Sequence, residues 1–301
     1  MRLCRFNDNR LGVVDGSHVR DVTAALDLLP KPGYPFPTHD LLIEHLERIV
    51  ERARALLPSA RPLPLDSVTL LSPVANPGKI IAAPVNFEKH REEARKDPQL
   101  HGNNPGNFTI HTAGLFLKAT SSLVGPGEGV VVRLPQRRTD HEVELVVVIG
   151  KRANHVARQD AMAYVAGYAI GLDISIRGTE DRSFRKSPDT YSVVGPWLVT
   201  ADEIPNPGSL DLQITVNGEV RQQSNTRHFI LGVAELIELA SSMYTLDPGD
   251  LIFTGTPEGV SPIHAGDSIL ATVASIGSMA VAVRAEDVIS APAMSTSSAG
   301  A

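Results

Sequence analysis

Two acids at the start of an apolar run are the first residues in this chain that could do metal chemistry. Glu142 and Glu144 open the run Glu142 to Ile149, which has the composition of a buried strand. Residues two apart in a strand point to the same face, so the two carboxylates would stand side by side. Such a pair is unfavourable unless a cation lies between them, and hard divalent ions such as Mg²⁺ take oxygen ligands. The alternative is an amphipathic strand whose Glu side chains are solvated.

A third acid favours the metal site. Asp173 lies within the β-type run Ala166 to Ile176, where its neighbours are apolar. An isolated carboxylate would be costly there, whereas a metal ligand would not. Three carboxylates around one divalent ion leave a net negative charge, which a nearby cation would balance. Lys186 is the candidate, although a solvated loop lysine is the more common case for any single Lys.

A histidine and a glutamate could supply acid–base chemistry. His90 and Glu93 are three residues apart in the predicted helix Phe87–Lys96, so they share a face and can form a dyad. A histidine oriented by a carboxylate can take a proton from water. Because charged residues surround the pair, a solvated helix surface is the alternative.

The elements that must position these residues are mostly strands. Further strands are predicted at Lys79–Ala83 and Leu210–Val216, and tight hairpin turns at Asp15-Gly16 and Asn217-Gly218. Helical spacing covers 38–57, 158–165 and 230–242. Strands and helices do not alternate regularly, which disfavours a doubly wound parallel sheet. The pattern predicts an α+β fold rich in β-structure.

Composition divides the chain into parts. We interpret the proline-rich stretch 58–65 as a connector between a small N-terminal α+β domain, residues 1–72, and a main domain, residues 73–289. Residues 290–301 are small and uncharged, and they are predicted to be a disordered tail.

Bulk properties exclude several classes of function. The 301 residues carry a net charge of −6, which argues against a nucleic-acid partner. Cys4 is the one cysteine, so no disulfide can form within the chain, and we expect it to be a small core residue. No apolar segment has the length of a membrane span or a signal-peptide core, so a cytoplasmic enzyme with no membrane partner is expected. The serine-hydrolase elbow G-x-S-x-G and the zinc helix H-E-x-x-H are also missing.

Six motifs, in order along the chain, resemble the fumarylacetoacetate hydrolase family, in particular its bacterial members of the 2-hydroxyhepta-2,4-diene-1,7-dioate isomerase type. They are the helix motif from Asn86 to Glu93, the paired-Glu strand 140–150, Asp173-Ile174-Ser175-Ile176-Arg177, Lys186-Ser187-Pro188-Asp189-Thr190 with Gly195-Pro196-Trp197, the hairpin Val216-Asn217-Gly218-Glu219 with Asn225-Thr226, and Pro248-Gly249-Asp250 with the block 254–260.

The resemblance implies a mixed β-roll catalytic domain and a homodimer. It also implies one Mg²⁺ or Mn²⁺ per subunit, held by Glu142, Glu144 and Asp173. The implied reaction is hydrolysis of a C–C bond in a 2,4-dioxo acid, such as an acylpyruvate or fumarylpyruvate, through a metal-stabilised enolate. His90 and Glu93 would activate water, and Lys186 would stabilise the oxyanion. The substrate contacts implied are Asn86, Lys118, Arg177 and Thr256.

Other activities remain open on the same scaffold, because an isomerase, a tautomerase or an oxaloacetate-type decarboxylase begins with the same enolate. A catalytically inactive relative is a third possibility. Departures from the family pattern bear on the substrate: Phe87 replaces a frequent Tyr, and Arg185 stands where Gly is usual. We expect Phe87 to make the acyl pocket less polar, and the long connection 97–111 to form a mobile lid that carries the dyad over the metal.

Overall fold

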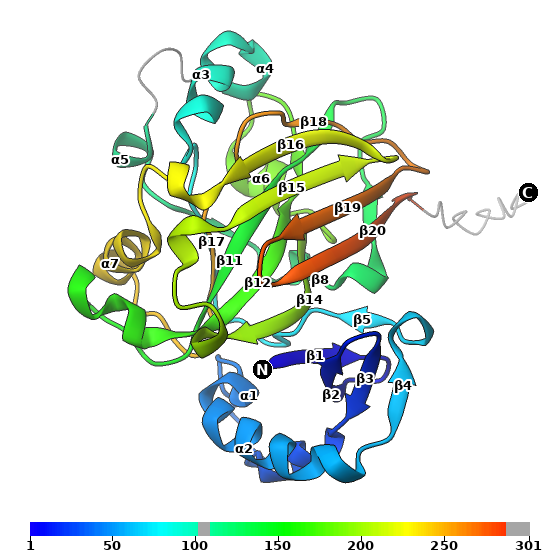
Figure 1. Ribbon diagram of the computed structural model, residues 1–301. Helices are drawn as coiled ribbons and strands as arrows, with labels where there is room; N and C mark the ends of the chain where they lie inside the picture. Colours follow the sequence, from blue (N-terminus) through cyan, green and yellow to red (C-terminus); the bar gives the residue numbers. More distant parts are fainter. Residues whose placement is uncertain (102–108, 287–301) are drawn as a thin grey trace, which may run out of the picture.

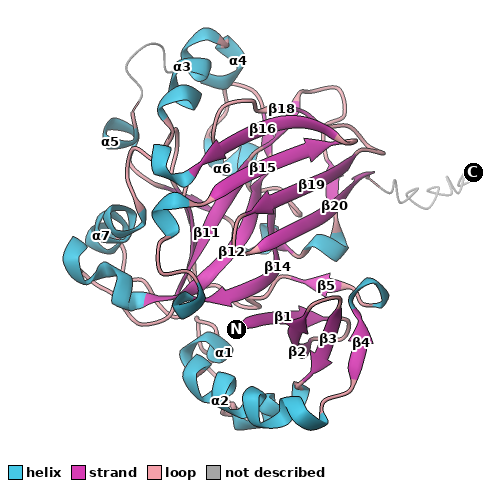
Figure 2. Ribbon diagram, in the orientation of Figure 1, coloured by secondary structure: helices cyan, strands magenta, loops and turns pink. Residues whose placement is uncertain are grey.

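The computed structural model describes residues 1–101 and 109–286. A long, highly curved sheet runs through the molecule in the order β4-β3-β2-β1-β14-β12-β11-β17-β6-β7 (Figures 1 and 2). Its central strands, β11 and β14, are buried along their whole length because other elements cover both faces. The strands on this path are β1 (Arg2–Phe6), β2 (Arg10–Asp15), β3 (His18–Asp21), β4 (Pro62–Pro64), β6 (Ile80–Ala82), β7 (Phe116–Lys118), β11 (Val143–Ile149), β12 (Val165–Asp173), β14 (Ser192–Thr200) and β17 (Leu251–Phe253); β5 (Leu70–Leu71) pairs with β1 and β8 (Leu123–Val124) with β14.

A second sheet packs across the central strands and closes the roll (Figure 2). Its order is β16-β15-β19-β20-β9, formed by β9 (Val130–Val132), β15 (Asp211–Val216), β16 (Glu219–Asn225), β19 (Ser268–Val273) and β20 (Gly277–Ala285). Buried and exposed residues alternate along β19 and β20, as expected for a sheet with one face on the core. Val147 and Ile170 of the first sheet share a core with Ile214 and Val281 of the second.

A short third sheet marks the open end of the roll. It consists of β13 (Ser175–Ile176), β10 (Thr139–His141) and β18 (Ser261–Pro262). The run predicted as one strand from Ala166 to Ile176 is therefore two strands, because the main chain leaves the first sheet at Ile174, whose N–H donates to the carbonyl of Tyr191. Glu142 likewise lies between β10 and β11 and not within a strand.

The N-terminal part adds its strands to the same sheet, since β1 pairs antiparallel with β14. The proline-rich stretch contributes β4, which pairs with β3. Ile49 and Ala53 of the helix α2 (Leu46–Leu56) pack on this part of the sheet. The division at residue 72 stays a prediction, and the predicted tail lies outside the described residues.

Helices cover the ends of the roll and the outside of the N-terminal part (Figure 1). The predicted helix 158–165 is a 3₁₀ segment, Arg158–Tyr164, and the predicted helix 38–57 is two helices. Both predicted hairpin turns are confirmed. The helices are α1 (Leu41–Glu44), α2 (Leu46–Leu56), α3 (Glu88–Lys96), α4 (Pro98–His101), α5 (Ile110–Ala113), α6 (Arg182–Lys186) and α7 (Val233–Met243).

The connection 97–111, predicted to be one long loop, includes α4 and the start of α5. Its middle, residues 102–108, lies outside the described residues. The lid movement predicted for this connection therefore stays a prediction. None of the helices in the described part combines the length and the apolar character needed to cross a membrane. The β-rich α+β architecture predicted from the sequence is confirmed.

Candidate active site

The three predicted metal ligands converge at the open end of the roll. Oxygen atoms of Glu142, Glu144 and Asp173 lie within 4.8 Å of one another, and all three side chains are buried. The pairing of β11 with β12 explains this, because Val143 lies opposite Leu172 and Glu144 opposite Gly171. Acids at the start of one strand and at the end of its antiparallel neighbour must therefore meet.

Two buried lysines contact the triad. Lys186, the last residue of α6, donates from Nζ to Glu142 Oε2 at 2.8 Å and to Asp173 Oδ2 at 2.7 Å. Lys118, at the end of β7, donates to Asp173 Oδ1 and to the carbonyl of Tyr191. Lys186 thus stands where the charge balance requires a cation, and Lys118 contacts a metal-site acid.

Arg177 is held by carboxylates on two sides. Its Nε donates to Asp140 Oδ2 and its Nη2 to Glu142 Oε1, both at 2.7 Å. Asp140 also accepts two hydrogen bonds from Arg138. Sequence reasoning did not assign a role to Asp140, although its position two residues before Glu142 was a usable signal. Its carboxylate fixes Arg177 against the triad.

The two glutamates of the triad have opposite electrostatic surroundings. Burial would raise the pKa of Glu142, but Lys186 and Arg177 more than offset it and lower that pKa below its ordinary value. Burial, together with Asp173 and Glu142, raises the pKa of Glu144 well above its ordinary value. Its Oε2 accepts a hydrogen bond from Gly255 N at 2.6 Å, and it forms no ion pair with any described residue. Glu144 is therefore the acid with an unmet need for a cation.

The oxygen donors and their burial suit a hard divalent ion, since Mg²⁺ and Mn²⁺ prefer carboxylate ligands. No cysteine or histidine belongs to the group of three. The residues present therefore fit the predicted metal.

His90 and Glu93 form the predicted dyad. Nδ1 of His90 lies 2.9 Å from Glu93 Oε2. Glu93 Oε1 accepts from the main-chain N–H of Gly259 at 3.0 Å, so the carboxylate is fixed on both sides. His90 is 7% exposed, which contradicts the solvated alternative. With Nδ1 bonded to the carboxylate, Nε2 is the nitrogen that can accept a proton.

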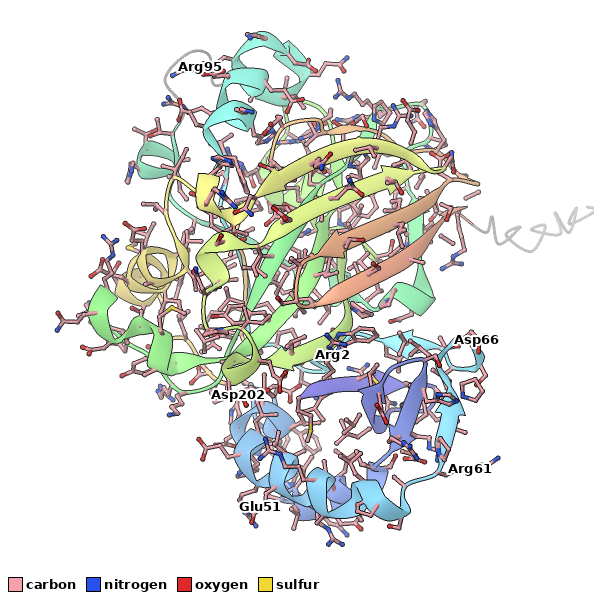
Figure 3. All side chains as sticks on the ribbon, in the orientation of Figure 1. Arg2, Glu51, Arg61, Asp66, Arg95 and Asp202 are labelled. Carbon is pink, nitrogen blue, oxygen red and sulfur yellow. The ribbon has the colours of Figure 1, made fainter. Side chains whose placement is uncertain are left out.

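One cavity of about 310 Å³ unites the triad with the dyad histidine. Thr256 also lines it, and its hydroxyl donates to the carbonyl of Val143 and accepts from Gln222. The helices α3 and α6 form walls of this cavity at the same end of the molecule, where Figure 3 labels Arg95 of α3.

Three residues expected at the substrate, Asn86, Phe87 and Lys118, do not line this cavity. Asn86 is buried, and its side chain makes three hydrogen bonds of 2.8 Å to main-chain atoms of Leu231 and Thr254, which positions those loops. Phe87 is 1% exposed and packs edge-on against Phe229, with ring centroids 4.9 Å apart. The expectation that Phe87 alters the polarity of the acyl pocket is wrong, because the strand-like entry into α3 turns its ring into the core.

A β-roll with three buried acids beside a His–Glu dyad is the arrangement of a metal-dependent enzyme that acts on small organic acids. The chain belongs to the fumarylacetoacetate hydrolase family: the family model for the fumarylacetoacetate (FAA) hydrolase C-terminal region matches residues 79–284. The resemblance deduced from the six motifs is thereby confirmed.

Relatives cover nearly the whole chain. A maleylpyruvate hydrolase from Aquipseudomonas alcaligenes is 56% identical over 286 residues, which is 94% of this chain and 99% of that protein. The rat mitochondrial oxaloacetate tautomerase Fahd2a is 36% identical over 251 residues, 81% of this chain and 75% of that protein. Among solved structures, maleylpyruvate hydrolase from Sphingobium sp. SYK-6 in complex with manganese (II) ion and pyruvate superposes with a TM-score of 0.80 at 40% identity, covering 95% of this chain and 99% of that one.

Proposed function

We propose that this protein is a divalent-metal-dependent hydrolase that cleaves a C–C bond in a 2,4-dioxo acid, releasing pyruvate and a carboxylic acid. One observation carries the proposal: the acid triad, Lys186 and His90 line the same cavity, and Glu93 holds His90 from behind. The similarity to two maleylpyruvate hydrolases supports an acylpyruvate as the substrate class.

Glu142, Glu144 and Asp173 would hold one Mg²⁺ or Mn²⁺ per subunit. The bound ion would supply Lewis-acid polarisation of the substrate oxygens. The manganese in the Sphingobium structure supports this cofactor. Lys186 and Arg177 keep Glu142 ionised, so this carboxylate is ready to act as a ligand.

His90 would be the general base. Glu93 holds it through Nδ1, so Nε2 can take a proton from a water molecule as the water oxygen bonds to the acyl carbonyl carbon. The bond between that carbon and the methylene carbon then breaks. Its electron pair moves toward the 2-oxo group, and the methylene carbon finally takes a proton to give pyruvate. Lys186 would stabilise the negative charge that develops on oxygen.

The substrate contacts divide into two groups. Thr256 and Arg177 line the cavity, so both stay candidates for orienting the substrate. Asn86 and Lys118 are proposed to position the site, because they do not line the cavity and their polar groups are already bonded to protein atoms.

The second candidate function is tautomerisation or isomerisation without C–C cleavage, with oxaloacetate decarboxylation as a further variant. It is favoured by the similarity to oxaloacetate tautomerases. The dyad can serve either candidate, because tautomerisation also needs a base that moves a proton. The higher identity to maleylpyruvate hydrolase, 56% against 36% for the tautomerase, favours hydrolysis.

Product analysis separates the candidates. The protein is loaded with Mg²⁺ or Mn²⁺ and incubated with several 2,4-dioxo acids and with oxaloacetate. We expect pyruvate and the matching carboxylic acid in equal amounts from the dioxo acids. Isomers without cleavage, or CO₂ from oxaloacetate, would replace the hydrolase proposal by the second candidate, and no reaction with any compound would favour an inactive relative.

We also propose a homodimer in the cytoplasm. Leu117 and Phe184 are apolar side chains exposed near the cavity, at 44% and 56%, and a partner subunit would cover them. Light scattering coupled to gel filtration tests the dimer. Cell fractionation tests the location.

A further inference from the structure

Arg185 differs from the other buried cations near the triad in what it binds. Its side chain lines the cavity and is 8% exposed. Nε donates to the carbonyl of Glu180 at 2.8 Å and Nη1 to the carbonyl of Ile176 at 3.2 Å. No carboxylate forms an ion pair with it within residues 1–101 and 109–286. Its hydrogen-bond partners are therefore neutral carbonyl groups, and Glu142 and Glu180 act on its charge without forming an ion pair with it.

The acids closest to Arg185 along the chain are engaged elsewhere. Glu180 accepts two hydrogen bonds from Arg137, which lower the pKa of Glu180 to about 2. Asp181 caps the start of α6 by accepting from the N–H and hydroxyl of Ser183. Neither of these two carboxylates forms an ion pair with Arg185.

The other buried arginine of the site is already neutralised. Arg177 bonds to Asp140 and Glu142, whereas Arg185 has Arg177 and Arg182 as like-charged neighbours. Burial, reinforced by these two arginines, lowers the pKa of Arg185. Arg182 lines the same wall, with its guanidinium 5.5 Å from the centre of the Phe116 ring. Glu180 and Asp181 line the same wall but form their hydrogen bonds elsewhere, so an anion inside the cavity would satisfy the charge of Arg185.

In the proposed function the 2-oxo acid group of an acylpyruvate would bind at the triad, which leaves the acyl group for another wall. We propose that Arg185 binds a second carboxylate at the end of the acyl group, so that the enzyme prefers dicarboxylic acylpyruvates over those with a neutral acyl group. This inference rests on the proposed function. A guanidinium–carboxylate contact at a mostly buried arginine is both strong and directional.

The test compares two substrates in matched variants. Maleylpyruvate carries the second carboxylate and acetylpyruvate does not. For Arg185→Gln, we expect kcat/KM for maleylpyruvate to fall on the order of 10- to 100-fold, the usual effect of losing a hydrogen bond to a charged group, while kcat/KM for acetylpyruvate changes less than about twofold. Arg185→Lys, which keeps the charge, should recover part of the loss.

Arg95→Gln is the control, because Arg95 lines the mouth of the same cavity with an exposed side chain and the charge change is identical. An equal loss for both substrates in Arg185→Gln would show a structural role and overturn the inference. A maleylpyruvate-specific loss in Arg95→Gln and none in Arg185→Gln would also overturn it. If the unmodified protein cleaves neither compound, the proposed function itself fails.

Discussion

At the scale of single residues, Glu144 distinguishes a metal site from a set of ion pairs. Glu142 and Asp173 each contact a lysine, but Glu144 is bonded to a main-chain N–H and has no cation. Its raised pKa follows from burial and from the two neighbouring acids. A divalent ion would satisfy Glu144 and complete the charge balance of the triad.

Replacement of the acids should therefore weaken metal binding. Glu144→Ala and Asp173→Ala each remove an oxygen ligand, and we expect Mg²⁺ or Mn²⁺ affinity to fall by at least about 100-fold, because even residues behind the ligands change affinity by 10- to 100-fold. Titration calorimetry measures this. Glu51→Ala on α2, whose position is labelled in Figure 3, is the control because Glu51 is exposed and far along the chain from the site. Unchanged affinity in both acid variants would refute the metal site.

The dyad should affect chemistry and not metal binding. His90→Ala removes the base, so we expect kcat for C–C cleavage to fall by roughly 10²- to 10⁴-fold with metal affinity near that of the unmodified protein. Glu93→Gln should lower kcat less, since the amide still accepts from Gly259 but no longer stabilises a protonated histidine. An unchanged kcat in His90→Ala would remove His90 from the mechanism.

At the scale of elements, the side chain of Asp40 connects the start of α1 by hydrogen bonds to the segment that precedes β6. Oδ1 accepts from Leu42 N and Ile43 N at the start of α1, and Oδ2 accepts from Ala75 N and Asn76 N. A helix cap alone contributes about 1 kcal/mol, and this carboxylate is buried with four donors.

We expect Asp40→Ala to lower the free energy of unfolding by about 2–4 kcal/mol, because two further N–H groups lose their acceptor. Urea denaturation followed by circular dichroism measures this. Asp66→Ala, at an exposed position of the N-terminal part, is the matched control and should change stability by less than about 0.5 kcal/mol. Equal stability of the two variants would mean that Asp40 does not link the segments.

At the scale of the whole molecule, the N-terminal part and the roll share one sheet through β1 and β14. Cys4 lies on β1 and is fully buried, which confirms its expected place in the core. Burial raises the pKa of the Cys4 thiol to about 12.

The thiolate is the reactive form of cysteine, and a raised pKa lowers the fraction of Cys4 that is present as thiolate. Cys4 should therefore be almost unreactive toward a disulfide reagent near pH 8 in the folded protein. Reaction should become fast in urea, when the thiol returns to its ordinary pKa. The absorbance of the released thiol measures both rates. Fast labelling of the folded protein at pH 8 would show that the N-terminal strands open independently of the roll.

Local sequence patterns determined much of this protein. Turn residues specified both hairpins, because such turns depend on local backbone geometry. Helical spacing allowed His90 and Glu93 to share a face, and the family motif identified them as a dyad. Alternation predicted Glu142 and Glu144 side by side, and their oxygens do lie together although Glu142 precedes β11. The order of the motifs indicated the family.

Only the tertiary structure decided which distant groups meet. The contacts of Lys186, Lys118 and Arg177 with the triad depend on the pairing of β11 with β12 and on the place of α6, which no local pattern encodes. The sequence also did not predict the burial of two further residues. The ring of Phe87 enters the core and not the cavity, and the guanidinium of Arg185 is buried without an ion pair to a described carboxylate. Residue type sets what a side chain can do, but its partners and its exposure to water are set by the packing of segments far apart in the sequence.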